Sequence, residues 1–360
     1  MLLRFKVKNS IFALMKKSIN YLFSLLSIVL LANACSTDFK VGADYKDYTV
    51  VFGLLSRSDT AHYMKITKGF YDEKNSNLLI AQNVDSLYFN NIEVKMYKYA
   101  GLNVVDSILL KKVDINLEGY YKDSGVFVNT PNYAYKFKEL LDPSKKYKLV
   151  VKNLNTGKIV FGETDVLDNT KIVFSRPVSS DKLNFAQVGV SFTNFTWNTP
   201  DNVSIFDLYL RFRYEEKNSA YNPVKITSVV KMIPLVKSIP NQNSPMNITV
   251  SAEDFYRALQ GEISPAGTNI TRFLDTPDVV IAAAGQELKT YIDVTSSQGG
   301  ITYDQIKPFY TNMKGENVLG LFSSRATVNS NQIQFSKATN DSILFGSYTK
   351  ALKFVGISSK

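Results

Sequence analysis

The chain has 360 residues, one Cys, one His and a formal net charge of +10, from 42 basic and 32 acidic side chains. Five of the basic residues and none of the acidic ones precede the only cysteine, Cys35, so the rest of the chain carries about +5. Its lysines are scattered rather than gathered in a basic stripe with aromatic neighbours, which excludes a typical nucleic-acid-binding surface.

The first predicted element is an export signal. Two lysines, Lys16 and Lys17, precede about a dozen mainly apolar residues at 21–32, fewer than the roughly 20 that a membrane-spanning helix needs. Small residues then lead to Cys35. Met15 opens a signal of ordinary length, so we expect translation to start there.

This arrangement resembles a bacterial lipoprotein signal. The resemblance implies that residues 1–34 are removed and that the Cys35 thiol takes a diacylglyceryl group, so that several acyl chains hold the protein on a membrane. Residues 35–44 would form a polar tether. The alternative is a plain secretory signal with a cysteine nearby. Acylation of Cys35 leaves no thiol for a disulfide, so stability must come from apolar cores, and the length suffices for about two domains.

A first β domain is predicted at residues 45–168. The continuous apolar run at 48–55 predicts a buried strand, and a second strand follows at 62–70. Polar and apolar residues alternate at 92–99, which indicates a half-exposed antiparallel strand.

The end of this domain carries a more specific pattern. Leu141, Pro143, Tyr147, Leu149 and Val151 stand in the order found at the tyrosine corner of fibronectin type III-like sandwiches, where a Tyr hydrogen-bonds to upstream backbone. An Asn-Thr-Gly turn after them predicts a hairpin. The resemblance implies an immunoglobulin-like or fibronectin type III-like sandwich, and the alternative is a coincidence in an ordinary strand.

A second β domain is predicted at 171–357. A strand with Trp197 and a Pro turn precede the strand at 205–215, whose apolar residues recur with period two. This order is similar to the B and C strands of an immunoglobulin-like fold and makes Trp197 a core residue, with sugar stacking as the alternative. The predicted fold class is therefore mainly β, with two β-sandwich domains and one or two short helices in the second.

One helix is predicted with both of its ends. It covers 252–260, begins after Ser251 with Asp254 three residues later, and stops at Gly261. Further elements are predicted in this domain: a β-hairpin at 278–294 and a short helix at 303–309. Two more strands, at 318–323 and 351–355, are predicted to complete its sheet.

No catalytic group, metal ion or cofactor is predicted. A Ser–His–Asp system would have to use His62, which lies in a predicted strand and is more simply a structural histidine. Zinc needs about four Cys or His ligands, and the sequence has neither an EF-hand loop nor a glycine-rich phosphate loop. A two-carboxylate hydrolase stays open, because a sequence does not show the distance between two acids.

Four short motifs consist of Asp, then Ser or Thr, then an apolar residue. They are similar to the O-glycosylation motif of exported Bacteroidota proteins, which would make the hydroxyl residues acceptors. Asp-Ser turns before strands are also common without any sugar. The four candidate acceptors are Thr60, Ser86, Ser107 and Ser342.

A wider resemblance rests on the Cys35 anchor, the strands within 48–67, the strand at 92–99 and the segment 317–322. These parts resemble Bacteroidota envelope lipoproteins that pair an immunoglobulin-like or carboxypeptidase-regulatory-like N-terminal domain with a second β domain. The resemblance implies an outer-membrane lipoprotein, on the periplasmic or the cell-surface face, and many such proteins are thought to accompany outer-membrane receptors.

We therefore expect a non-enzymatic binding or interaction module, with an outer-membrane receptor or another envelope protein as partner. Sandwich folds usually bind their ligands through loops. The candidate contact regions are therefore the loops at 71–77, 119–132 and 221–223. The aromatic residues expected to stack on sugar or peptide are Tyr120, Tyr121 and Tyr133. The alternatives are a structural subunit of an adhesion, gliding or secretion assembly and, ranked lower, a carboxylate-based hydrolase.

Overall fold

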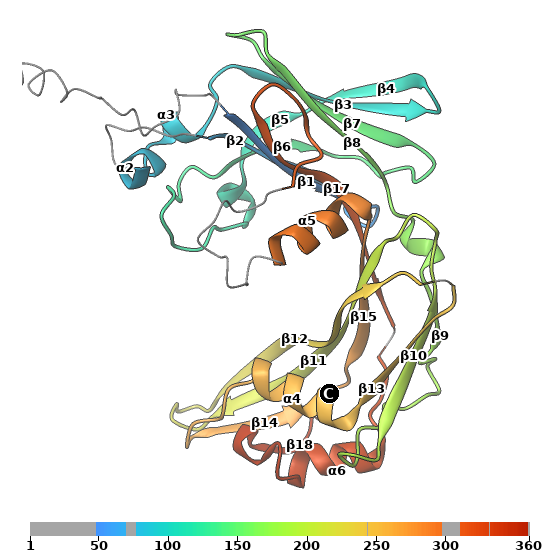
Figure 1. The fold of residues 1–360 in the computed structure, drawn as a ribbon. Helices are drawn as coiled ribbons and strands as arrows, with labels where there is room; N and C mark the ends of the chain where they lie inside the picture. Colours follow the sequence, from blue (N-terminus) through green and yellow to red (C-terminus); the bar gives the residue numbers. More distant parts are fainter. Residues whose placement is uncertain (1–47, 70–76, 243, 297–309, 331, 359–360) are drawn as a thin grey trace, which may run out of the picture. The chain divides into compact units, whose positions relative to one another are not determined.

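The fold is taken from a computed structural model that describes residues 48–69, 77–242, 244–296, 310–330 and 332–358. The expected signal peptide, Cys35, the tether and the expected helix at 303–309 lie outside the described residues. The prediction of a mainly β chain is confirmed, because three sheets account for most of the regular structure in the described ranges (Figure 1).

The largest sheet has ten strands. Nine follow the order β18-β14-β11-β15-β17-β1-β2-β6-β5, and β12 pairs with β11. Its strands are β1 (Tyr48–Leu55), β2 (His62–Gly69), β5 (Lys111–Asp114), β6 (Tyr133–Phe137), β11 (Ile205–Asn218), β12 (Lys225–Pro240), β14 (Ile270–Leu274), β15 (Asp278–Ala284), β17 (Val318–Asn329) and β18 (Phe354–Ile357).

Two smaller sheets and several short helices complete the fold. The five-stranded sheet has the order β16-β8-β7-β3-β4, with β3 (Ile92–Ala100), β4 (Asn103–Leu109), β7 (Lys146–Asn153), β8 (Ile159–Asp165) and β16 (Lys314–Gly315). The three-stranded sheet has the order β13-β10-β9, with β9 (Val173–Arg176), β10 (Phe192–Asn198) and β13 (Met246–Ser251). The helices are α2 (Asn77–Ala81), α3 (Val84–Leu87), α4 (Ala252–Glu262), α5 (Gln286–Ser296), α6 (Lys337–Phe345) and the 3₁₀ turns η1 (Ile115–Glu118), η2 (Asn169–Lys171) and η4 (Lys350–Leu352).

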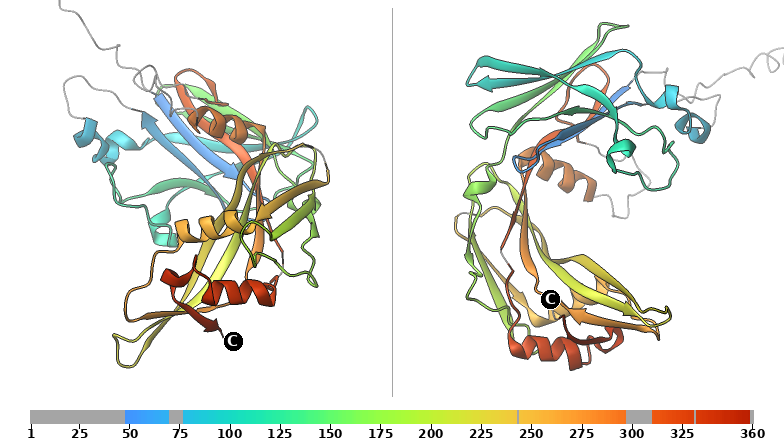
Figure 2. Two further views of the ribbon diagram at one scale, coloured as in Figure 1. Left: turned by 60° about the horizontal axis from the view of Figure 1, so that its bottom comes forward. Right: turned by 180° about the vertical axis from the view of Figure 1, so that it is seen from behind.

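A first apolar core lies between the five-stranded sheet and the β17-β1-β2-β6-β5 part of the large sheet (Figure 2). Val51 and Met64 come from the large sheet, Met96 and Leu149 from the smaller one, and all four are fully buried. The alternation predicted at 92–99 is confirmed, since the residues between the buried ones of β3 are only half-buried. Two sheets with one core between them form a β-sandwich.

The predicted tyrosine corner is also confirmed. The fully buried Tyr147 accepts a hydrogen bond at its hydroxyl oxygen from the backbone N–H of Asp142, at 2.9 Å. The hairpin predicted after it is formed by β7 and β8, with Gly157 at φ = +73° in the connecting turn.

We expect Tyr147→Phe to lower the free energy of unfolding by about 1–2 kcal/mol, because the Asp142 N–H then loses its partner without a change in packing. Urea denaturation measures this loss. The control is Tyr121→Phe, which removes the same hydroxyl from a side chain that is 81% exposed and should change stability by less than about 0.5 kcal/mol. Equal losses in the two variants would contradict the role of the corner.

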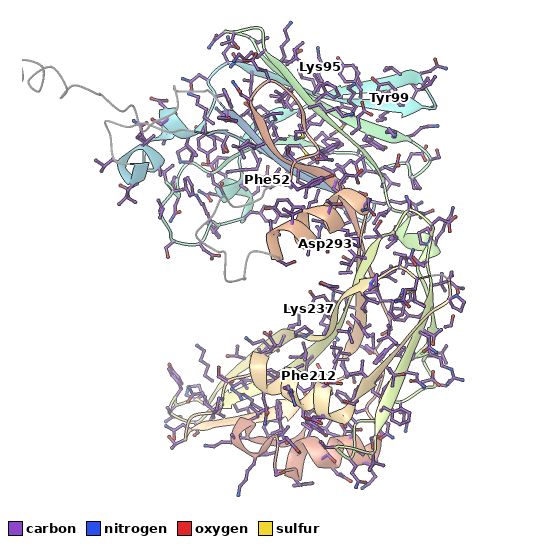
Figure 3. The ribbon with its side chains drawn as sticks, in the orientation of Figure 1. Phe52, Lys95, Tyr99, Phe212, Lys237 and Asp293 are labelled. Carbon is purple, nitrogen blue, oxygen red and sulfur yellow. The ribbon has the colours of Figure 1, made fainter. Side chains whose placement is uncertain are left out.

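A second apolar core contains Trp197, which is fully buried as predicted and meets Phe206 edge-on at 5.5 Å between ring centroids. Phe212 of β11 lies in the same core (Figure 3). Phe255 of α4 packs there as well, so that this helix covers the core beside the sheets. Trp197 and Phe206 belong to strands of different sheets, as the B and C strands of a sandwich do.

The predicted helix start is confirmed, because the Ser251 hydroxyl accepts a hydrogen bond from the Asp254 N–H at 3.1 Å. The predicted stop at Gly261 is wrong by two residues, since α4 runs through Glu262 and ends where the Ile263 N–H bonds to the Leu259 carbonyl.

The second strand of the predicted hairpin at 278–294 is wrong. Its first strand is β15, but the following residues form the helix α5. Leu288, Tyr291 and Ile292 are spaced by three and four residues and so share one helical face. Lys289 and Asp293 form an ion pair one helical turn apart, at 2.5 Å.

Strand β17 takes part in both cores (Figure 1). Its first part pairs with β1 in parallel, and its second part pairs with β15 in antiparallel fashion. Val318 and Phe322 lie in the first core, whereas Ala326 lies in the second. The predicted second domain, 171–357, thus includes a segment that completes the first sandwich.

Candidate functional site

Strand β1 buries only one of its faces. Val51 and Leu55 point into the first core, whereas Phe52 and Leu54 are 41% and 37% exposed. The prediction of a strand buried on both faces was therefore wrong. The continuous apolar run reflects two apolar surfaces, of which one is the core and the other is accessible.

The accessible face of β1 is extended by its neighbours. Phe52 lies opposite Leu321 of β17 and opposite Lys65 of β2, and side chains of paired residues share one face of a sheet. Helix α5 covers the end near β17, where the Tyr291 ring meets Phe52 edge-on at 6.1 Å between centroids. Figure 3 labels Phe52.

These side chains surround a pocket of about 560 Å³, which we call the sheet-face pocket. This volume falls within the range of roughly 300–1,000 Å³ that small-molecule sites occupy. The lining residues are Phe52, Gly53, Leu54, Asp59, Ala61, His62, Tyr63, Lys65, Ile115, Ala134, Leu288, Tyr291, Leu321 and Arg325. Most of them are apolar, and a small number of charged groups stand among them.

Lys65 is the most perturbed of these charged groups. Its amine donates hydrogen bonds to the Tyr88 hydroxyl oxygen at 3.0 Å and to Asn132 Oδ1, and it lies 5.0 Å from the centre of the Tyr88 ring. The pKa of Lys65 is lowered to about 8, chiefly by burial and also by the positive charge of Lys122, while the negative charge of Asp114 acts in the opposite direction. A desolvated ammonium group of this kind favours a nearby anion.

The remaining charged groups at the pocket are paired. Arg325 forms an ion pair with Asp59 at 3.2 Å. Tyr63 donates a hydrogen bond to Glu118, which also forms an ion pair with Lys136 and whose pKa is lowered chiefly by that lysine.

Two of the three predicted contact tyrosines lie close to this region. Tyr120 packs against the pocket residue Tyr63, with 5.5 Å between ring centroids. Tyr133 packs edge-on against Tyr88, the partner of Lys65, at 5.2 Å. Tyr121 is highly exposed. Their roles as ligand contacts stay predictions.

Of the other predicted contact regions, residues 71–76 are outside the described part of the chain. In the region 221–223, Tyr221 is exposed and carries the Lys225 amine 5.5 Å from its ring centre.

The four candidate glycosylation sites differ in accessibility. Thr60 lies in the exposed turn between β1 and β2, and Ser107 is exposed on the edge strand β4. Ser86 is half-buried in α3. Ser342 is half-buried in α6 and donates a hydrogen bond to the Ala186 carbonyl at 2.6 Å. Thr60 and Ser107 are therefore the acceptors that a glycosyltransferase would reach most easily.

His62 lies in strand β2, as predicted, and its structural role stays a prediction. The side chain is buried, its Nε2 lies 2.9 Å from the Glu139 carbonyl oxygen, and its ring packs against Phe137 at 4.8 Å.

Several acidic residues that stand next to another acid in the sequence have structural partners. Glu216 pairs with Arg272, Glu253 pairs with Arg257, and Asp254 accepts a hydrogen bond from Ser251. Within the described ranges, no group of three His, Cys, Asp or Glu side chains is placed to hold a metal ion. In the same ranges, no helix has the length and hydropathy to cross a membrane.

Comparison with known proteins gives little similarity. No family model matches the chain, and no curated protein matches it. The solved structures with similarity include the C-terminal globular domain of an oligosaccharyltransferase from Pyrococcus abyssi, with a TM-score of 0.20 and 12% sequence identity. The match covers 81% of this chain and 49% of that one, so this chain spans about half the length of that structure.

Proposed function

We propose that the chain is an outer-membrane lipoprotein that binds a small molecule in the sheet-face pocket, without catalysing a reaction. The pocket carries this proposal, because apolar walls with a few convergent polar groups are the usual composition of ligand sites. The N-terminal pattern that ends in Cys35 supports attachment to the membrane. The proposed partner is an outer-membrane receptor or another envelope protein.

The membrane attachment is tested by growing producing cells with an alkyne-tagged palmitate. We expect the wild-type chain to carry the tag and to stay in the membrane fraction, and Cys35→Ala to lose both properties. An untagged wild-type chain would refute the anchor.

Binding is tested by calorimetry on the full chain purified in nanodiscs, with empty nanodiscs as the blank. The probes are 2-naphthoate and its neutral counterpart 2-naphthamide, and we expect at least one of them to bind. Leu54→Ser should weaken that binding, because Leu54 lines the pocket. The matched control Leu109→Ser changes an exposed leucine of strand β4, outside the pocket, and should have no effect. If neither probe binds the wild type, the binding function is refuted.

A structural subunit of an envelope assembly is the second candidate, because two edge strands expose apolar side chains. Val104 and Val105 are exposed on β4, and Ile226 and Val230 are exposed on β12. Such edges invite pairing with another chain. Sedimentation at rising protein concentration would then show association that Val230→Lys weakens, whereas a monomer at all concentrations would exclude self-assembly.

A further inference from the structure

The acidic groups at the sheet-face pocket already have cationic partners. Asp59 is paired with Arg325, and Glu118 is paired with Lys136 and accepts a hydrogen bond from Tyr63. A cationic ligand would have to displace one of these partners.

Lys65 is in the opposite situation. The two hydrogen-bond partners of its amine among the described residues, Tyr88 Oη and Asn132 Oδ1, are neutral oxygen atoms. An ammonium group has three N–H donors, so within the described part of the chain one donor is left for a ligand. Two further charges act on Lys65, of which Lys122 is positive and Asp114 is negative. Among the charged side chains of the described residues that line the pocket, Lys65 is the one without an ion pair, since Asp59 and Arg325 pair with each other.

The other residues that line the pocket favour a ligand with an apolar body. Phe52, Leu54 and Leu321 come from the sheet, and Leu288 and Tyr291 come from α5. Together they offer aromatic and aliphatic contacts on two sides of the same space. Lys65 is paired with Phe52 across β1 and β2 and lines the pocket, so its side chain starts beside this apolar surface.

We propose that the sheet-face pocket binds an organic acid with an apolar body, whose acidic group contacts Lys65 and whose body lies on Phe52 and Leu54. The proposal rests on the proposed binding function, since it names the ligand class of the same pocket. A single uncompensated amine fits a monoacid. Aromatic acids and fatty acids share this chemistry.

The test compares 2-naphthoate with 2-naphthamide, which differ in the negative charge, on the full chain in nanodiscs. We expect the acid to bind at least about tenfold more tightly than the amide, as a charged hydrogen bond would give. Lys65→Met should remove this preference. Lys68→Met is the matched control, because it removes a lysine of the same strand that does not line the pocket.

The pH dependence gives a second readout. Since the pKa of Lys65 is about 8, the affinity for 2-naphthoate should fall as the pH rises through 8 and Lys65 loses its charge. Binding at pH 8.5 should take up a proton, which calorimetry in buffers of different ionisation enthalpy detects. Lys65→Arg keeps its charge and should show neither effect.

The other groups that face Lys65 should not produce this profile. Burial raises the pKa of the Tyr88 phenol above its usual value near 10, so Tyr88 stays neutral. Asp114 and Lys122 are the two further charged groups that act on Lys65. Burial lowers the pKa of Lys122, which is tested separately as Lys122→Met. Asp59 with Arg325 and Glu118 with Lys136 are paired charges at the same pocket.

The outcomes separate the two proposals. Tighter binding of the acid that depends on Lys65 supports the inference, and decanoate then shows whether an alkyl acid is bound better than the aromatic one. An unchanged acid preference in Lys65→Met, or equal affinities of acid and amide in the wild type, would overturn the inference while the binding function stands. If neither naphthalene probe binds the wild type, the binding function itself fails.

Discussion

Replacing Gly320 by alanine is expected to disrupt the pairing of β17 with β1 and to lower the free energy of unfolding by more than about 4 kcal/mol. Gly320 has φ = +119° and lies opposite Val51. A Cβ atom at this position would stand 1.8 Å from the Val51 carbonyl oxygen and 2.7 Å from its carbonyl carbon. Because these are backbone atoms, no side-chain movement relieves the overlap. Chemical denaturation followed by circular dichroism measures the loss.

A substitution at a second glycine distinguishes the effect of this overlap from the effect of backbone strain alone. Gly101 also has a positive φ, +61°, but no atom lies within 4 Å of the Cβ that alanine would add there. Gly101→Ala should therefore cost only the strain of the left-handed conformation, about 1–2 kcal/mol. A Gly320→Ala variant no less stable than Gly101→Ala would contradict the close approach of β17 to β1.

Trp197→Ala is expected to cost about 3–5 kcal/mol, the usual range for removing a large aromatic side chain from a core. Trp197 is fully buried in the second core and contacts Phe206 edge-on. Truncation would leave a cavity between the three-stranded sheet and β11. Urea denaturation followed by circular dichroism is the suitable measurement, because Trp197 is the only tryptophan and its fluorescence is lost in the variant.

The matched variant Trp197→Phe keeps an aromatic ring in the same place. It should lose clearly less stability than Trp197→Ala, because part of the contact with Phe206 is retained. An alanine variant as stable as the wild type would show that Trp197 is not a core residue.

Local patterns predicted the parts of the fold that depend on near neighbours in the chain. The Tyr147 hydroxyl reaches back five residues to Asp142, and the Ser251 hydroxyl caps an N–H three residues ahead. Contacts of this range leave a readable spacing in the sequence. Trp197 was placed by the two strand patterns around it, and both strands exist.

Helix α5 was missed because its sequence fits two periods. Leu288, Tyr291 and Ile292 fit a helical face, while the β-branched and aromatic residues among 288–294 also fit a strand. Packing decides between them, since the helix lies against β17 and places Tyr291 on Phe52. That surface is made by residues far away in the sequence.

The sheet-face pocket was missed for the same reason. Lys65 follows the buried Met64, and this alternation does mark an accessible face of β2. The sequence around Phe52 does not indicate that Leu321 lies beside it, because the paired residues of β1 and β17 are about 270 positions apart. A pocket assembled over such separations has no local signature.

The separation between β1 and β17 also constrains how the chain comes to its native state. While the protein is being synthesised, β1 and β2 leave the ribosome long before β17, and the nascent edge of β1 stays open until residues 318–324 arrive to pair with it. Pairing of this range is slow to form and leaves apolar strands vulnerable to association. A polypeptide truncated before Val318 would therefore keep an unpaired, association-prone edge on β1.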